Sequence, residues 1–104
     1  MSNLKHYKMF INGEWVESES KKTFETLNPE NNKPWAVVPE ASTKDVDKAV
    51  KAAQTAFEGE WPKLLPRERA KFLRAIGEKL RENAELLGKI ETIDTGKLFR
   101  ETNK

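Results

Sequence analysis

Residues 42–57 read STKDVDKAVKAAQTAF, and at this stretch the sequence changes from a strand-like to a helix-like pattern. Apolar residues recur there at the spacing of one helix face, which predicts an amphipathic helix. This face consists of Val46, Ala49, Val50, Ala53 and Phe57. Ser42 precedes Asp45 by three positions, a capping-box pattern with Asp in place of the usual Glu or Gln. We therefore expect a helix that begins after Ser42 and ends near Gly59.

Two more helices are predicted downstream. The second opens at Pro66, which the first turn of a helix tolerates, and runs to about Asn83. Its inward positions are Ala70, Leu73, Ile76, Gly77 and Leu80, and on its outer face Arg74 and Glu78 have the spacing of an ion pair. The third helix begins near Asn83, a good N-cap, and reaches Thr95-Gly96. Its buried positions are Leu86, Leu87, Ile90 and Ile93.

Upstream, residues 8–17 (KMFINGEWVE) predict a β-hairpin. Asn12-Gly13 lies between two apolar arms, and this pair best tolerates the positive φ angles of a type I′ turn. A two-residue loop sets Phe10 opposite Trp15. The remaining cross-strand pairs are then Ile11 with Glu14, Met9 with Val16 and Lys8 with Glu17.

Two short strands should follow the hairpin, at residues 23–27 and 35–38. Between them NPENNKP is strong turn punctuation. Pro34 and Pro39 bracket the later strand and have no N–H to donate, so we expect it at a sheet edge or a strand end. The predicted fold class is α+β, with a polar tail over 1–7, strands over 8–40 and three helices over 42–96.

The 104 residues and 12.0 kDa allow one domain at most, with a modest core. Charged residues make up 35% of the chain, and the mean hydropathy is −0.80. The net charge is only +2, and positive and negative residues are interleaved along the chain, which argues against nucleic-acid binding. The absence of cysteine excludes a disulfide, a thiolate metal site and a thiol nucleophile. The polar start and the lack of a long apolar run predict a soluble, cytoplasmic protein.

The Gly-Lys of ETIDTGK, residues 91–97, raises the question of a phosphate-binding loop. Such a loop needs a second glycine five positions before Gly96 and a hydroxyl residue after Lys97. Those positions hold Glu91 and Leu98, so the motif fails at both ends. We expect Gly96 to end a helix in the left-handed conformation, with Lys97 near the negative end of the helix dipole. No G-x-G-x-x-G occurs anywhere in the chain.

Other candidate site residues are scattered. His6 is the only histidine and is expected to be a mobile surface residue. Acidic pairs that offer general acid and base chemistry in principle are Glu17 with Glu19, Asp45 with Asp47, and Glu91 with Asp94. The tryptophans are expected to anchor a core or an interface, and they are Trp15, Trp35 and Trp61. No assembled catalytic, cofactor-binding or metal site is predicted.

The order of several segments is specific. FINGEW, LNP, VPEASTKDVDKAVKAAQTAF, LPRERAKFLRAIGEKLRENAELL and IETIDTGK follow one another at spacings that resemble the N-terminal portion of NAD(P)-dependent aldehyde dehydrogenases, from about residue 8 to the end. The resemblance implies that residues 1–104 form a single partial domain, the N-terminal part of a cofactor-binding domain. In that family a cysteine attacks the aldehyde, hydride passes to NAD or NADP, and a glutamate activates water. This chain has no cysteine and so lacks the nucleophile. The family's oxyanion-stabilising and cofactor-binding residues lie beyond the matched region, so no catalytic or cofactor residue is carried over, and we expect the chain alone to be inactive.

The resemblance also implies one partial site. Backbone carbonyls in the stretch matching Thr26-Leu27 help to hold a monovalent cation in many family members, but the other ligands come from later segments. Residues 97–104 would lead into a further helix, so we expect a truncated end there. The expected partners are the remainder of the dehydrogenase or other subunits, with self-association as a further outcome and without nucleic acid or membrane. The alternatives are a free-standing binding or assembly module derived from this segment and an unrelated small α+β binding module.

Overall fold

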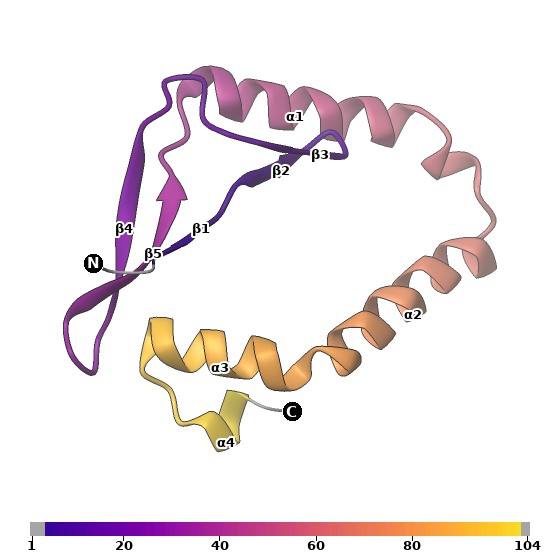
Figure 1. The fold of residues 1–104 in the computed structure, drawn as a ribbon. Helices are drawn as coiled ribbons and strands as arrows, with labels where there is room; N and C mark the ends of the chain where they lie inside the picture. Colours follow the sequence, from indigo (N-terminus) through magenta and orange to yellow (C-terminus); the bar gives the residue numbers. More distant parts are fainter. Residues whose placement is uncertain (1–3, 103–104) are drawn as a thin grey trace. The chain divides into compact units, whose positions relative to one another are not determined.

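The computed structural model describes residues 4–102, and its fold class is α+β (Figure 1). The strands come first and the helices follow. The strands are β1 (Lys5–His6), β2 (Met9–Ile11), β3 (Glu14–Val16), β4 (Thr23–Asn28) and β5 (Lys33–Pro39). The helices are α1 (Thr43–Glu58), the short 3-10 helix η1 (Trp61–Lys63), α2 (Pro66–Glu82), α3 (Ala84–Thr95) and α4 (Phe99–Thr102).

The chain divides into two compact units. The first unit is the described part of Met1–Leu27 together with Pro34–Lys63, and it holds nearly all of the strands and α1. The second unit is Asn28–Lys33 together with Leu64–Lys104, in its described part, and it holds α2, α3 and α4. None of the helices within residues 4–102 is long and apolar enough to span a bilayer. That residues 1–104 form one partial domain of a larger fold stays a prediction.

The predicted hairpin is confirmed in β2 and β3. Met9 pairs with Val16, Phe10 with Trp15 and Ile11 with Glu14 in an antiparallel ladder. Asn12 and Gly13 have φ angles of 53° and 77°, as a type I′ turn requires. The predicted pairing of Lys8 with Glu17 is not part of this ladder, and Glu17 instead forms an ion pair with Lys21 at 3.1 Å.

The three-stranded sheet corrects two expectations. Its order is β1-β5-β4, so β5 is the central strand and not an edge. Pro34 and Pro39 lie at the second and last positions of β5, so the N–H groups between them remain free to donate to the neighbouring strands. The tail predicted over residues 1–7 contains β1, which runs parallel to β5 with Lys5 opposite Ala36, and the adjacent Tyr7 N–H donates to the Val37 carbonyl at 3.0 Å.

Helix α1 begins as predicted. Ser42 is the N-cap, its hydroxyl accepts the Asp45 N–H, and the Asp45 carboxylate accepts the Ser42 N–H. The apolar face of the predicted amphipathic helix is largely exposed, with Val50 60% accessible and Phe57 69% accessible. Among the described residues, the only buried hydrophobic ones are Ala36 and Val37, both in β5. Little of this chain therefore covers the apolar face of α1.

The second unit shows the same mismatch between apolar pattern and burial. Leu73, Ile76 and Leu80 of α2 were predicted to face inward, but each is more than half exposed. Leu86 and Leu87 of α3 are exposed as well, whereas Ile90 and Ile93 are half-buried. The positions of α3 that were predicted to be buried are therefore only partly covered by other residues. The predicted pairing of Arg74 with Glu78 is replaced by an ion pair of Glu78 with Arg81 at 2.7 Å.

Asn83 joins α2 to α3 in a way the sequence did not predict. Its side-chain Nδ2 donates to the carbonyl of Lys79 at 2.9 Å, so it caps the C-terminus of α2. Its side chain makes no cap hydrogen bond to α3, which was its predicted role. At the start of α2, the Glu68 carboxylate accepts the Leu65 N–H at 2.9 Å, which satisfies one donor beside Pro66.

The described residues beyond Gly96 include a short helix. A further helix was expected to follow this point, and α4 forms at Phe99–Thr102 and packs beside α3 (Figure 1). That residues 97–104 are a truncated end stays a prediction. The Thr102 hydroxyl donates to the Gly88 carbonyl at 2.9 Å and lies 3.0 Å from the Thr92 hydroxyl oxygen. The predicted turn after β4 is also present, with the Asn32 N–H donating to the Asn28 carbonyl at 2.7 Å.

Candidate functional site

The Gly-Lys of residues 96–97 ends α3, as predicted. Gly96 has φ +80° and its N–H donates to the Thr92 carbonyl at 2.9 Å. A Cβ at this position would lie 3.2 Å from Pro29 Cγ, so the glycine also permits close packing within the second unit. Lys97 reaches back to the Glu91 carboxylate at 3.8 Å. The left-handed glycine is therefore a helix terminator.

His6 lies on the surface in β1, opposite Val37 of β5. Its predicted surface position is confirmed, although the strand pairing was not foreseen. It lines a hollow of about 210 Å³ whose charged members are Lys8, Glu17, Lys21 and Lys22. Glu17 and Lys21 already form an ion pair, which lowers the pKa of Glu17 from its ordinary value. The side chains around this hollow are mostly exposed surface groups, and nothing there orients His6 for proton transfer.

For two of the three acidic pairs considered from the sequence, the structure gives the two members separate contacts or surroundings. Glu19 forms an exposed ion pair with Lys44 at 3.3 Å. Asp45 is buried in a hydrogen-bonded cluster, whereas Asp47 is exposed on α1. Within residues 4–102 there is no group of three or more His, Asp or Glu side chains that could hold a metal ion.

The three tryptophans occupy separate places, as expected. Trp15 contacts Phe10 across the hairpin, with ring centroids 4.9 Å apart. Trp35 of β5 meets Tyr7 edge-on at 6.2 Å. Trp61 lies on η1 and is 41% exposed. Trp15 and Trp35 therefore take part in two separate ring contacts.

Thr26 and Leu27 lie near the end of β4, beside the central strand β5. Thr26 is half-buried and Leu27 is exposed. A monovalent cation prefers several convergent oxygen ligands, and two carbonyls of one strand supply only part of such a set. A cation-binding role for these carbonyls stays a prediction.

A concave apolar surface is present in the second unit, as a groove formed by α2 and α3. Its volume is about 490 Å³ and it is open to solvent. Six of its eight lining side chains are aliphatic or aromatic, and the lining is Phe72, Ala75, Ile76, Lys79, Leu80, Asn83, Leu86 and Leu87. These residues include positions that the sequence assigned to buried helix faces. The groove is therefore suited to an apolar protein segment and offers no polar constellation for chemistry.

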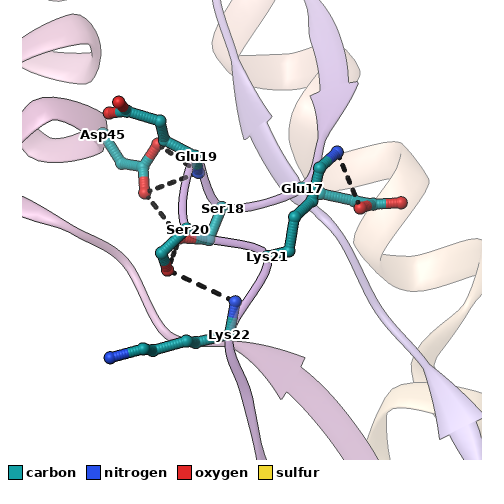
Figure 2. Close-up of polar contacts among 7 residues, drawn as sticks. All are labelled: Glu17, Ser18, Glu19, Ser20, Lys21, Lys22 and Asp45. Atoms are coloured by element: carbon teal, nitrogen blue, oxygen red, sulfur yellow. Dashed lines mark hydrogen bonds and ion pairs between the residues drawn. The ribbon is translucent and has the colours of Figure 1, made fainter.

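A second arrangement, which we name the Asp45 clasp, joins the loop between β3 and β4 to the first turn of α1 (Figure 2). The clasp consists of Asp45, Ser18, Ser20, Ser42 and the backbone of Glu19. The Ser18 hydroxyl donates to Asp45 Oδ2 at 2.9 Å, and the Glu19 N–H donates to Asp45 Oδ1 at 3.2 Å. The Ser42 N–H and hydroxyl donate to Oδ2 at 2.8 and 3.0 Å.

Asp45 is only 4% exposed, yet its surroundings favour the ionised form. The hydrogen bond from the Ser42 backbone is the largest influence, and the Ser18 hydroxyl, the Glu19 backbone and the Ser42 hydroxyl act in the same direction. Burial opposes them but does not prevail, so the pKa of Asp45 falls to about 2. The carboxylate is therefore charged and fully hydrogen-bonded near neutral pH.

The sequence indicated half of this clasp and missed the other half. Ser42 and Asp45 were recognised as a capping box because they are three residues apart. Ser18 and Glu19 lie in a loop that the sequence marks only as polar, and no local pattern connects them with Asp45, which lies 27 and 26 positions away. The same holds for the groove, since its lining residues read as two separate buried stripes.

Known proteins match the segments described above. The model of the aldehyde dehydrogenase family matches residues 15–104. An aldehyde dehydrogenase of Aspergillus niger is 47% identical over 89 residues, which are 86% of this chain and 18% of that protein. The aldehyde dehydrogenase family 2 member C4 of Arabidopsis thaliana is 42% identical over 101 residues, which are 96% of this chain and 20% of that protein. The chain thus spans about a fifth of the length of these relatives.

Solved structures give the same result. Betaine aldehyde dehydrogenase from Staphylococcus aureus, in complex with NAD+, superposes with a TM-score of 0.90 and 40% identity over 97% of this chain and 20% of its own. An NAD-dependent aldehyde dehydrogenase from Sinorhizobium meliloti superposes with a TM-score of 0.92 and 30% identity over 96% of this chain and 20% of its own. The chain belongs to the aldehyde dehydrogenase family and corresponds to the N-terminal region of that fold.

Proposed function

We propose that this chain forms the N-terminal part of the cofactor-binding domain of an NAD(P)-dependent aldehyde dehydrogenase. The whole enzyme would oxidise an aldehyde to a carboxylic acid, and this chain alone would be catalytically inactive. The observation that carries the proposal is the family match over residues 15–104. The NAD+ complex of the Staphylococcus aureus relative supports a nicotinamide cofactor for the whole enzyme.

The residues of this chain do not suit the cofactor or the chemistry by themselves. The chain has no cysteine, so it offers no thiol for attack on an aldehyde. The Gly-Lys of residues 96–97 ends a helix, and the chain has no glycine-rich fingerprint of the kind that holds a pyrophosphate at a helix N-terminus. NAD or NADP would therefore be held by other parts of the enzyme, and we assign no catalytic, cofactor-binding or metal-ligating residue here.

The exposed apolar faces support a structural role within a larger assembly. Val46, Val50 and Phe57 lie along the exposed face of α1, and Leu73, Ile76 and Leu80 along that of α2. Monomeric proteins rarely leave such extensive apolar surfaces in water, because covering them is favourable by about 25 cal/mol per Å² of apolar area. We propose that the covering partner is the remainder of the dehydrogenase chain or another subunit of the enzyme.

A second candidate function is a free-standing binding or assembly module. The open groove of about 490 Å³ between α2 and α3 favours it, because this surface would also serve a partner helix or a full-length subunit. The intact mass of the protein in its source cells separates the two candidates. A mass near 12.0 kDa favours the module, and a mass several times larger favours the enzyme segment.

Two measurements on the isolated chain test the proposed inactivity. Isothermal titration calorimetry with NAD and with NADP should give no saturable heat, and an absorbance assay of NAD reduction with several aldehydes should give no turnover. A full-length relative treated in parallel is the positive control. Saturable binding of either nucleotide by the isolated chain would contradict the proposal that the cofactor is held elsewhere.

A further inference from the structure

We propose that the Asp45 clasp is a charge-dependent latch: the ionised carboxylate holds the loop between β3 and β4 against the start of α1, and neutralising the carboxylate releases this loop. The hairpin β2–β3 and the body of α1 would stay folded when the latch opens. All of the residues involved lie in the first unit, so the proposal is independent of the enzyme's cofactor and substrate.

The hydrogen bonds that the Ser18 and Ser20 hydroxyls donate point toward the Asp45 carboxylate. Ser18 has one hydroxyl proton and donates it to Asp45, so the contact of 3.1 Å between the Ser18 and Ser20 hydroxyls must run from Ser20 to Ser18. Ser20 in turn accepts the Lys22 N–H at 3.3 Å. The donors therefore form a chain from Lys22 through Ser20 and Ser18 that ends at the carboxylate, as Figure 2 shows.

Such an aligned chain depends on the negative charge at its end. Hydrogen bonds that point in one direction polarise one another, and those to a charged acceptor are the stronger ones. A protonated Asp45 would carry an O–H donor where the Ser18, Ser42 and Glu19 donors already point. At least one of these donors would then lose its acceptor in a buried place, which is unfavourable. Neutralisation thus weakens the whole chain and not one bond alone.

The other ties between the loop and the helix are weaker. The ion pair of Glu19 with Lys44 lies at 3.3 Å, and both side chains are largely exposed, so it adds little. Within the loop, the Lys21 N–H donates to the Ser18 carbonyl at 2.9 Å, and Lys21 has a φ of 62°. These contacts shape the loop but do not attach it to α1. The clasp is therefore the principal attachment between the two.

The charged neighbours of the clasp do not replace Asp45. Besides Asp45, the titratable side chains on the loop, on the connection after β5 and on the first turns of α1 are Glu17, Glu19, Lys21, Lys22, Glu40, Lys44, Asp47 and Lys48. Glu17 is paired with Lys21 and Glu19 with Lys44, both on the exposed side. The Glu40 backbone N–H donates to the Lys22 carbonyl at 2.9 Å, which ties the far end of the loop to the connection after β5. Asp45 is the buried acidic group among those described.

Hydrogen exchange of backbone amides tests the latch directly, because two of its donors are the N–H groups of Glu19 and Ser42. The variants are Asp45→Asn, which removes the charge at nearly constant shape, and Ser18→Ala, which removes the loop's hydroxyl and leaves the Ser42 cap in place. Asp47→Asn is the matched control, because Asp47 is an exposed acid two residues later on the same helix.

The expected result is local. In Asp45→Asn the exchange of the Glu19 amide should be faster by about tenfold or more, as the loss of a buried charge-assisted bond predicts. Ser18→Ala should accelerate the same amide, while amides of the hairpin and of the middle of α1 exchange as before. Asp47→Asn should leave the Glu19 amide unchanged. Unchanged exchange at Glu19 in both test variants would overturn the proposal, and so would an equal acceleration at every amide of the first unit.

Discussion

Ser18 and Asp45 lie 27 positions apart in the sequence, and the Ser18 hydroxyl donates a hydrogen bond of 2.9 Å to the Asp45 carboxylate. Both side chains are buried, with exposures of 2% and 4%. A buried carboxylate is tolerated only where donors surround it, and Ser42 and the Glu19 backbone supply the others. This contact connects the strand region with the first helix.

Lowering the pH should decrease the stability of the first unit, because Asp45 becomes protonated. Its folded pKa of about 2 lies below the ordinary value of 3.8, so the unfolded chain binds this proton more readily. The stabilisation is therefore fully present above about pH 4 and is lost as the pH falls toward 2. Carbon-13 NMR of the Asp45 carboxyl group would measure the shift, and a midpoint near 4 would contradict it.

Loss of the Ser42 cap should destabilise α1. Ser42→Ala removes the hydroxyl that accepts the Asp45 N–H at 3.2 Å and donates to its carboxylate. The expected loss in free energy of unfolding is about 1 kcal/mol, as for other N-caps. Urea denaturation followed by circular dichroism measures it. Thr55→Ala, at an exposed position inside α1, is the control and should cause no loss, because alanine favours a helix.

Replacing each of two glycines with alanine should change the free energy of unfolding in opposite directions. Gly96→Ala places a Cβ at φ +80° and 3.2 Å from Pro29 Cγ, so it should cost about 1–2 kcal/mol of unfolding free energy. Gly77→Ala lies within α2, where a new Cβ meets nothing within 4 Å, and should stabilise the helix by about 0.5–1 kcal/mol. Thermal denaturation of the two variants provides the comparison. A stabilising Gly96→Ala would show that the left-handed helix end was misassigned.

The aromatic pair on the hairpin should be coupled. Phe10 and Trp15 face each other with centroids 4.9 Å apart, and both remain more than half exposed. A double-mutant cycle with Phe10→Ala and Trp15→Ala should give a coupling of about 0.5 kcal/mol, the lower end for such pairs. His6→Ala is the control, and we expect no change in thermal stability because His6 lies on the surface. Additive effects of the two aromatic variants would disprove the coupling.

Local sequence patterns predicted the parts of the fold that local interactions determine. Asn12-Gly13 requires positive φ angles, and that requirement fixes the hairpin register. Ser42 and Asp45 mark the start of α1, and Gly96 marks the end of α3. The parallel pairing of β1 with β5 and the contact of Ser18 with Asp45 join distant segments, for which no short pattern exists.

The burial of the helices was predicted less well for a different physical reason. The apolar faces of α1 and α2 are where the periodicity places them, but Val50 and Leu73 remain exposed. Periodicity identifies the side of a helix that favours an apolar partner and does not say whether this chain supplies that partner. The relatives, of which this chain spans about a fifth, have the additional protein that such faces would need.

Reconstitution tests the proposed role of these faces most directly. The isolated chain would be mixed with the Arabidopsis relative from which the matching N-terminal segment has been deleted, and NAD-dependent aldehyde oxidation would be measured. We predict that the native chain restores activity. With Ile76→Glu the restored activity should be at least about tenfold lower, because a charge replaces an exposed apolar side chain of α2. The matched surface change Lys71→Glu should restore the same activity as the native chain. Failure of the native chain to restore activity, or equal restoration by Ile76→Glu, would contradict the proposal that this chain acts as the N-terminal part of the enzyme through its apolar helix faces.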